Sequence, residues 1–366
     1  MRLVNKNILL ISPEPWSHIF VSKHHYATHL AERGNQVVFL NPPSKKGYHI
    51  FKTKYSNLRV VDYQGFWKGL RFFPKFLRKR NESSVFKRIE KIADLKFDVI
   101  WSFDNSVFFD FDALPTSLLK ISHIVDLNQD FQTAKASATA DICFGVSKDI
   151  VKRLSLFNTN SHFINHGLNL KSDTALMPDV PGQNKIKAMY IGNLAMKYLD
   201  WAPIYSAVNT HSEVDFIFIG PNKDIVSSKI NSTHSYKKQV LEKSNAYFLP
   251  PINSKDIDAY LRAADVLFLC YQEQYHHYQS NPHKILEYLY SERPVVASYC
   301  AEYDDLCLLS MSKSNKDWKL LFSEVLRDLN ELVDSAIAER RRSFALANTY
   351  EKQIDKIQKL IDETLS

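Results

Sequence analysis

The chain has 366 residues, more than one hydrophobic core usually holds, so we expect two domains of about 150–190 residues. Hydrophobic residues at 45% and charged residues at 24% are typical of a globular protein and exclude a disordered chain. The net charge of +7 is modest but unevenly distributed, and the nine glycines form neither the dinucleotide-binding Rossmann fingerprint nor a P-loop.

The four cysteines form no C-x-x-C pair, and three of them lie in or beside apolar runs. This usage predicts buried, reduced thiols in a cytoplasmic protein. The apolar run at residues 8–11 is too short for the core of a signal peptide and predicts a first strand instead. No stretch approaches the 18 apolar residues of a membrane-spanning helix.

In the first half of the chain, short apolar runs alternate with helical patterns. The runs 7–12 and 36–41 flank a predicted helix, with Ser22 as its N-cap and Gly34 at its end. Further buried strands are expected at 97–103, 120–126, 141–147 and 161–167. This alternation predicts a parallel, doubly wound sheet in a first domain, residues 1–169.

The polar stretch 170–185 contains two prolines and a glycine and is the best candidate for a linker. After it the pattern restarts, with strands expected at 187–193, 214–220, 245–251, 265–270 and 294–298, and helices near 200–211, 255–264 and 282–291. We expect a second domain over 186–345 and a C-terminal helix over 346–366. The predicted fold class is α/β, with two Rossmann-like doubly wound domains facing each other across a cleft.

Residues 281–298 form the most informative motif. Asn281 is the predicted N-cap of a helix and Pro282 its first residue, and such a helix end is suited to a diphosphate. Lys284 in the first turn opposes the helix dipole unless an anion compensates it. Glu287 lies one turn further on the same face, where a carboxylate can accept hydrogen bonds from ribose hydroxyls. The alternative is an amphipathic helix with a Lys–Glu surface pair.

This stretch resembles the donor-binding helix of GT-B glycosyltransferases, especially the family 4-like enzymes that build bacterial surface polysaccharides. Their P-x-K-x-x-E-Y pattern, followed by G-x-P-V-V-A-S, corresponds to residues 282–288 and 292–298. Glu292 replaces the usual glycine, and Gln279 stands where many retaining members have a second glutamate. In that respect the chain is similar to the inverting glucuronosyltransferases of the xanthan type. The resemblance implies the GT-B fold, in which the C-terminal helix over 346–366 crosses back to the first domain. It also implies a nucleoside diphosphate-sugar donor, with UDP as the default nucleotide.

Other segments carry the same resemblance. Residues 190–200 resemble the strand and loop at which the family's backbone approaches the phosphates, and Gly192 permits that approach. Asn193 stands where many members have arginine, and Lys197 where many have a phosphate-binding lysine, although a solvated lysine is an equal alternative. The resemblance also implies that the loop from Leu249 to Ile252 faces the base. It covers residues 130–366 well and residues 1–130 only in outline.

In the family, the acceptor and any catalytic base belong to the first domain, at the carboxyl ends of its strands. An inverting transfer requires a group that takes the proton of the attacking hydroxyl. Asp126, directly after a predicted strand, and Asp130 are the first candidates, although an aspartate there can also cap a turn. His18, in the loop after the first strand, is an alternative base, whereas His24 and His25 are assigned structural roles.

Residues 66–80 combine six basic residues with five aromatic ones and contain no acid. This mixture is typical of a segment attracted to an anionic membrane surface. It is also compatible with RNA binding, or with a solvated basic face whose aromatics pack inward. We favour contact with the inner face of the cytoplasmic membrane, where a polyprenyl-linked acceptor is found, and expect no nucleic acid partner.

No metal or other cofactor is expected. Asp110 and Asp112, like Asp256 and Asp258, match the D-x-D motif of metal-dependent transferases, but a chain with this aspartate content contains such pairs by chance. His25 and His29 have helical spacing without the glutamate of an H-E-x-x-H site.

The sequence therefore predicts a metal-independent glycosyltransferase that moves a sugar from a nucleoside diphosphate-sugar to a saccharide or lipid-linked acceptor during synthesis of bacterial surface polysaccharide. Two alternatives remain open. One is a GT-B-type UDP-sugar epimerase, which needs no acceptor. The other is a two-lobed protein that binds a sugar or nucleotide without catalysis, for which an export signal would be expected.

Overall fold

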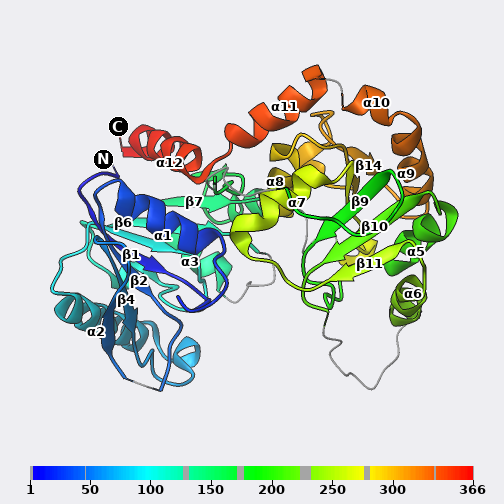
Figure 1. Cartoon of the computed structure of the whole chain (residues 1–366). Helices are drawn as coiled ribbons and strands as arrows, with labels where there is room; N and C mark the ends of the chain where they lie inside the picture. Colours follow the sequence, from blue (N-terminus) through cyan, green and yellow to red (C-terminus); the bar gives the residue numbers. More distant parts are fainter. Residues whose placement is uncertain are drawn as a thin grey trace. The chain divides into compact units, whose positions relative to one another are not determined.

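The computed structural model describes residues 3–45, 47–126, 132–170, 177–222, 232–275, 281–333 and 335–365 (Figure 1). The chain divides into two compact units, Met1–Asn169 with Tyr350–Ser366, and Leu170–Thr349. Each unit is built around one sheet of mostly parallel strands with helices, so the chain has the α/β fold expected from its sequence.

The sheet of the first unit has the strand order β3-β4-β2-β1-β5-β6-β7-β8. Its strands are β1 (Asn7–Ile11), β2 (Gln36–Leu40), β3 (His49–Lys52), β4 (Leu58–Asp62), β5 (Val99–Ser102), β6 (Leu119–Ile124), β7 (Ile142–Gly145) and β8 (Ser161–Phe163). Its helices are α1 (Ser22–Glu32), α2 (Lys75–Ala93), α3 (Thr133–Thr139), α4 (Lys148–Leu154) and α12 (Tyr350–Leu365), with a short 3-10 helix η1 (Leu70–Phe72). Only the edge strand β3 among the described strands runs antiparallel to its neighbour.

Alternate residues of the central strands pack into separate hydrophobic cores on the two faces of this sheet. Ile8 and Leu10 of β1 belong to one core, whereas Leu9 and Ile11 belong to the other. This period of two explains why the strands read as continuous apolar runs, since both faces are covered.

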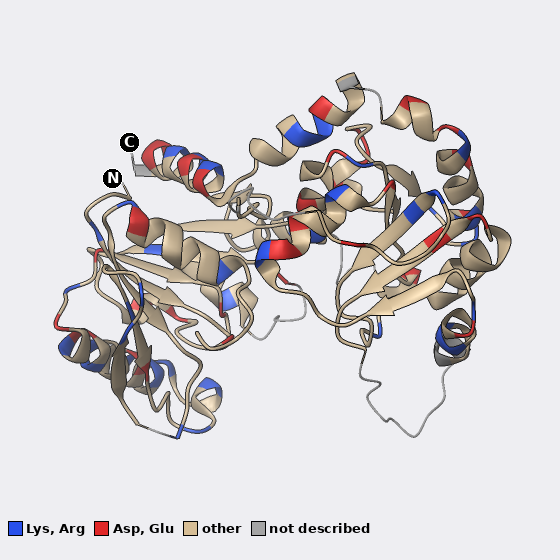
Figure 2. Ribbon diagram, viewed as in Figure 1, with Lys and Arg blue, Asp and Glu red and all other residues tan. Residues whose placement is uncertain are grey.

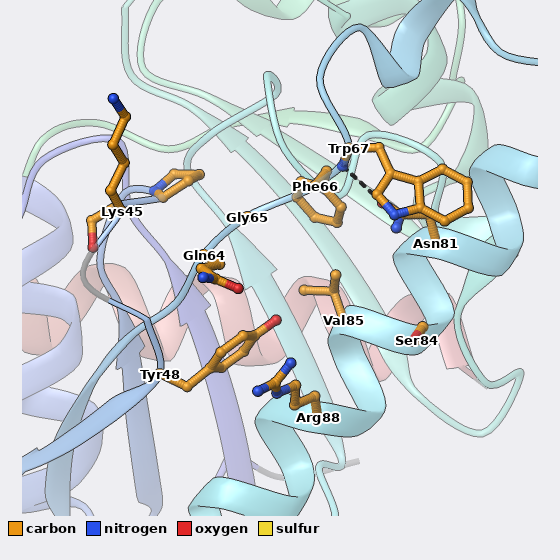
Figure 3. A pocket seen from close by; sticks show the side chains of 12 residues that line it. Lys45, Tyr48, Gln64, Gly65, Phe66, Trp67, Asn81, Ser84, Val85 and Arg88 are labelled. Atoms are coloured by element: carbon orange, nitrogen blue, oxygen red, sulfur yellow. Dashed lines mark hydrogen bonds between the residues drawn. The ribbon is translucent and has the colours of Figure 1, made fainter.

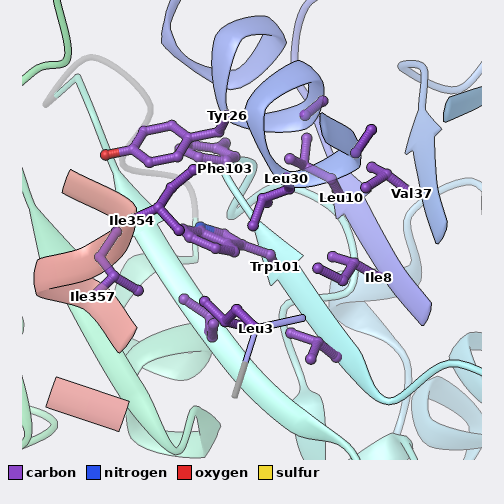
Figure 4. Packing of buried hydrophobic residues seen from close by; sticks show 14 of the residues in the cluster. Leu3, Ile8, Leu10, Tyr26, Leu30, Val37, Trp101, Phe103, Ile354 and Ile357 are labelled. Carbon is purple, nitrogen blue, oxygen red and sulfur yellow. The ribbon is translucent and has the colours of Figure 1, made fainter. Parts of the chain in front are cut away.

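Helix α12 completes the core that also contains α1 (Figure 4). Ile354, Ile357 and Ile361, spaced for one helix face, are fully buried against the sheet. A Cβ atom added to Gly167 would lie 2.3 Å from the ring of Tyr350, so the glycine permits the start of α12 to pack closely. The C-terminal helix therefore belongs to the N-terminal unit, as the family resemblance implied.

The sheet of the second unit has the order β11-β10-β9-β12-β13-β14, and every pairing described in it is parallel. Its strands are β9 (Ile186–Ile191), β10 (Val214–Ile219), β11 (Ala246–Leu249), β12 (Val266–Leu269), β13 (Val295–Ser298) and β14 (Ser310–Ser312). Its helices are α5 (Trp201–Thr210), α6 (Ser232–Leu241), α7 (Ile257–Ala263), α8 (Lys284–Tyr290), α9 (Trp318–Arg327), α10 (Leu329–Leu332) and α11 (Ser335–Leu346). Counted from β9, this is the 3-2-1-4-5-6 order of a doubly wound nucleotide-binding sheet.

Two predicted helix caps are wrong. Val21, in an extended conformation, is the N-cap of α1, and Ser22 is already helical. Helix α8 begins at Lys284 with His283 as its N-cap, two residues later than predicted. The reason is a tight turn in which the Ile285 amide donates to the Pro282 carbonyl at 3.1 Å, ahead of the regular helix.

Candidate active site

In the sheet of the second unit, the order in which successive strands are added reverses between β9 and β12. These two strands are adjacent although β10 and β11 lie between them in the sequence. In doubly wound sheets, ligands bind outside the carboxyl ends of the strands at such a point. Gly192 directly follows β9, and α8 is the helix that connects β12 to β13. Two sequence-predicted parts of the donor site therefore lie at this position.

Two glycines let the carboxyl ends of β9 and β10 approach each other closely. A Cβ atom on Gly220 would lie 1.9 Å from the Gly192 carbonyl oxygen, and Gly220 has a φ of +144° that other residues rarely adopt. The Gly192 amide donates to the Ile219 carbonyl at 2.8 Å. The sequence pattern predicted a role for Gly192 but not its dependence on Gly220, which follows β10.

Lys284 reaches the same glycine loop. A Cβ atom on Gly192 would lie 2.6 Å from the Cε atom and 2.9 Å from the Nζ atom of Lys284. Because any side chain at position 192 would displace the ammonium group, glycine there provides room for a cation at the end of β9. The ammonium also lies 5.9 Å from the centre of the Tyr190 ring.

The buried side chain of Tyr288 fixes α8 in this position. Its hydroxyl accepts a hydrogen bond from the Ile191 amide at 3.2 Å, one residue before Gly192. Burial raises the pKa of the Tyr288 hydroxyl, so it stays neutral and can accept this bond. Lys284 lies one turn earlier on the same helix, so the hydrogen bond of Tyr288 also positions Lys284 beside the Gly192 loop. We call this hydrogen bond the Tyr288 anchor.

The remaining predicted residues of the helix lie around this lysine. Asn281 and Pro282 are buried in the turn before α8. Glu287 is half-buried, three residues after Lys284. Residues 276–280, and with them Gln279, lie outside the described part of the chain.

Asn193 and Lys197 occupy the loop between β9 and α5, and both are exposed. The Asn193 carboxamide oxygen accepts the Ala195 amide at 3.0 Å, which shapes the loop. The Lys197 ammonium lies 5.2 and 5.4 Å from the ring centres of Tyr198 and Tyr275. Both distances are within the range of a cation–π contact.

Leu249 ends β11, next to β10, and its carbonyl accepts the Gly220 amide at 3.2 Å. Leu249 and the nearby Ile252 are half-buried and pack at the edge of the apolar core of this unit. The carboxyl ends of β9, β10 and β11 thus bring the predicted phosphate loop and the predicted base loop to one edge of the sheet.

Glu292 retains the backbone geometry of the glycine that it replaces in the family pattern. It follows the C-cap of α8 with a φ of +69°, in the left-handed region where glycine is favoured. Its carboxylate pairs with Arg342 at 2.9 Å, and its carbonyl accepts from Arg341. Both arginines lie on α11, so this helix supports the conformation that a glycine would adopt unaided.

In the first unit, His18 and Asp126 both lie after the carboxyl ends of strands, His18 after β1 and Asp126 after β6. His18 is exposed in the loop between β1 and α1, and its Nδ1 atom lies 2.8 Å from the Ile19 carbonyl. That contact requires a proton on Nδ1 and leaves Nε2 as the proton acceptor. Asp126 is half-buried after β6, and Asp130 lies outside the described residues.

The same edge contains acidic and basic groups that the sequence motifs did not indicate. Lys23 is buried and pairs with Glu14 of the β1–α1 loop at 2.6 Å. Asp104, after β5, is buried, and this burial raises the pKa of its carboxyl group. β1 and β5 are adjacent, so these groups mark the switch point of the first sheet. The position of Asp104 after an apolar run was a visible signal, but Glu14 and Lys23 required the fold.

His24 has the structural role that the sequence predicted. Its ring is stacked between Phe20 and Phe39, its Nε2 atom lies 3.1 Å from the Pro15 carbonyl, and burial lowers the pKa of its imidazole. A buried, neutral histidine with both ring nitrogens engaged shapes the β1–α1 loop.

Most aromatics of residues 66–80 point outward. Trp67 is 50% exposed, Phe72 78% and Phe76 69%, whereas Leu70 is buried as the anchor of η1. Figure 2 shows lysines and arginines along helix α2, whose first six residues belong to this segment. Lys75 and Lys79 lie 4.0 and 3.6 Å from Asp112, which the sequence did not associate with this segment. These exposures contradict the alternative in which the aromatics pack inward.

Within the described ranges, no group of three or more histidine, cysteine or acidic side chains is arranged to hold a metal ion. Over the same ranges, none of the helices is both long and apolar enough to cross a membrane.

No family model and no curated protein matches the sequence. Solved structures do match along the whole chain. Sucrose-phosphate synthase from Thermosynechococcus elongatus has a TM-score of 0.71 at 13% identity and covers 98% of this chain and 99% of its own. A glycosyltransferase from Rickettsia africae ESF-5 has a TM-score of 0.67 at 13% identity over 99% of both chains.

A third similar structure is HepE of Anabaena in complex with UDP and glucose, with a TM-score of 0.63 at 14% identity over 98% of this chain and 99% of that one. At such identities the likeness concerns the fold. It extends over both units, and the chain has the GT-B fold.

Proposed function

We propose that this protein is a glycosyltransferase that moves a sugar from a nucleoside diphosphate-sugar, with UDP as the nucleotide to test first, to a hydroxyl of a saccharide or lipid-linked acceptor. The observation that carries the proposal is the approach of Lys284 to the Gly192 loop at the switch point of the second sheet. HepE, which shares this fold, was solved with UDP and glucose.

In this proposal the second unit binds the donor. Lys284 neutralises the negative charge that develops on the departing diphosphate, which is electrostatic stabilisation of the leaving group. Lys197 and the backbone near Asn281 contribute to the same anion site, and Gly192 and Asn193 form the loop beneath it. The Glu287 carboxylate accepts hydrogen bonds from the ribose hydroxyls, and Leu249 and Ile252 contact the base.

The first unit supplies the acceptor and, for an inverting transfer, the base. The base takes the proton of the acceptor hydroxyl while its oxygen forms a bond to the anomeric carbon, and the bond between that carbon and the diphosphate breaks. Asp126 and Asp130 are proposed for this role, with His18 as the alternative. No metal is assigned a role, since lysines provide the positive charge.

Calorimetric titration of the full chain with UDP, GDP, ADP and dTDP tests the donor site. We expect one of the four to bind, and Glu287→Ala to weaken that binding at least tenfold, since a hydrogen bond to a charged group contributes about 1.5–3 kcal/mol. Glu331→Ala, which removes an exposed glutamate of α10 in the same unit, is the matched control and should leave the affinity unchanged.

Binding of none of the four nucleotides would overturn the donor site and favour the non-catalytic alternative. If a UDP-sugar is bound, product analysis without an acceptor separates transfer from epimerisation, because only an epimerase converts the sugar in the absence of a second substrate.

We further propose that residues 66–80 bind the anionic inner face of the cytoplasmic membrane and that the acceptor is used in surface polysaccharide synthesis. The exposed rings of Trp67, Phe72 and Phe76 lie in the same segment as exposed lysines and arginines. Aromatic side chains insert at the headgroup level while basic ones attract acidic lipids.

Vesicle sedimentation checks this contact. We expect binding to vesicles that contain phosphatidylglycerol and little binding to pure phosphatidylcholine. The double substitution Phe72→Ser with Phe76→Ser should reduce binding about tenfold or more, because burying one such ring contributes about 1.5–3 kcal/mol. Phe157→Ser, an exposed phenylalanine after α4, is the control. Equal binding by all variants would contradict the proposal.

A further inference from the structure

A cavity of about 570 Å³ lies in the first unit, where the loops that follow β2 and β4 meet helix α2 (Figure 3). It is therefore at the edge of the sheet where the parallel strands end. Its volume lies within the range of about 300–1,000 Å³ that is typical of small-molecule sites.

One face of α2 forms a wall of this pocket. Asn81, Ser84, Val85 and Arg88 line it, and the spacing of three, four and seven residues places them on the same side of the helix. Asn81 is buried, and its carboxamide oxygen accepts the Trp67 amide at 3.3 Å. The helix and the loop after β4 are thus tied together at the pocket.

Gly65 lets the two loops come together on the opposite side. It has a φ of +81°, and a Cβ atom added to it would lie 2.6 Å from the Pro43 side chain. Asn41, directly after β2, links this region to the loop that follows β1. Its side chain accepts a hydrogen bond from the Trp16 amide at 2.8 Å and donates one to Asp62 at 2.7 Å. The pocket is consequently part of the same loop system as the β1–α1 segment that contains His18.

The charged side chains that line the pocket are cationic. Lys45 and Arg88 are cationic, and no acidic side chain occurs among the described residues that line the pocket. Arg88 stacks on the ring of Tyr48, with its guanidinium carbon 4.1 Å from the ring centre, and Figure 3 shows the two side chains together. Lys45 is at the rim and extends away from them. A stacked arginine keeps its fork of N–H groups available for a carboxylate or phosphate.

The rest of the lining suits a sugar ring. Tyr48 and Phe66 are half-buried and Trp67 is half-exposed, and Arg88 covers one face of the Tyr48 ring. The remaining exposed parts of these rings can contact the C–H groups of a sugar. Gln64 and Ser84 are exposed and offer amide and hydroxyl groups to a ligand's hydroxyls. Neighbouring strands lie about 4.8 Å apart, so β4 is about 10 Å from β1, and a saccharide held here can extend to the β1–α1 loop.

We propose that this pocket binds an acidic sugar, one that carries a phosphate or carboxylate group, as the anchoring part of the acceptor. Arg88 binds the oxyanion and the aromatic side chains bind the ring. That the bound sugar is an acceptor rests on the proposed transferase function, whereas the binding itself does not.

Calorimetric or ligand-observed NMR titration of the full chain tests this site with glucose 6-phosphate, glucuronate, glucose and inorganic phosphate. We expect saturable binding of at least one of the two acidic sugars, at least tenfold tighter than that of glucose or phosphate alone. Arg88→Gln should weaken it tenfold or more, and Arg88→Lys should weaken it less, since the charge remains but the fork is lost. Lys87→Gln makes the same charge change at the neighbouring exposed position of α2, outside the pocket, and should have no effect.

Three results would overturn the proposal: no saturable binding of either acidic sugar, equal losses in Arg88→Gln and Lys87→Gln, or phosphate binding as tightly as the sugar phosphate. If Arg88→Gln instead reduces binding to phosphatidylglycerol vesicles while neither acidic sugar binds, the pocket takes a lipid head group. The Arg88→Gln variant should bind UDP normally, so a failure of the donor site remains distinguishable from a failure of this pocket.

Discussion

Replacing Lys284 by glutamine is expected to lower the rate of UDP release from a UDP-sugar by about 100- to 1,000-fold, equivalent to about 2.7–4 kcal/mol. The ammonium group is held against the Gly192 loop by the Tyr288 anchor, at the switch point where the diphosphate is proposed to bind. Without this cation, the charge that develops on the leaving group has no partner from α8.

The stability of the same variant separates a catalytic role from a structural one. Lys284 is the first residue of α8, where a positive charge opposes the helix dipole, so its removal should leave the second unit equally stable or stabilise it by about 0.3–1 kcal/mol. The assay measures UDP formed from the donor, alongside thermal unfolding. Lys316→Gln, an exposed lysine of the same unit, is the control. Unchanged UDP release, or a loss of stability that accounts for the lost rate, would contradict the assignment.

The substitution Gly220→Ala is expected to destabilise the second unit by about 3–5 kcal/mol and to abolish nucleotide binding. The new methyl group would lie 1.9 Å from the Gly192 carbonyl oxygen, a backbone atom that cannot move without separating β9 from β10. The φ of +144° adds strain for any residue with a side chain. Hydrogen exchange measured peptide by peptide would show that the loss of amide protection is confined to residues 177–349.

The control is Gly69→Ala in the first unit. Gly69 also has a positive φ, +71°, but the nearest atom to its added Cβ is 3.7 Å away in the Phe72 side chain. This variant should cost only about 1–2 kcal/mol from backbone strain. Similar losses of stability in the two variants would mean that the positive φ, rather than the close approach of β9 and β10, determines the effect at Gly220.

Buried apolar runs and turn residues located most strands of both sheets, because a strand covered on both faces is continuously apolar. Strands β3, β4 and β14 and helix α2 were missed. The cause is that β3 is exposed along its whole length, and η1 and Pro74 interrupt the pattern ahead of α2. Likewise the start of α8 was placed two residues early, since a tight turn and a helix start have the same local signature.

By itself, the sequence determined the α/β class and the motif that contains Lys284 and Glu287, since these follow from local periodicity and spacing. The return of the last helix to the first unit was implied only by the family resemblance. Only the tertiary structure decided which distant groups meet: Lys284 with Gly192, Gly220 with Gly192, Glu14 with Lys23, and Arg88 with Tyr48. It also showed that Glu292 adopts the glycine conformation and that the aromatics of residues 66–80 point outward. Such contacts depend on strand order and on the packing of helices across a sheet, and local sequence patterns do not specify either.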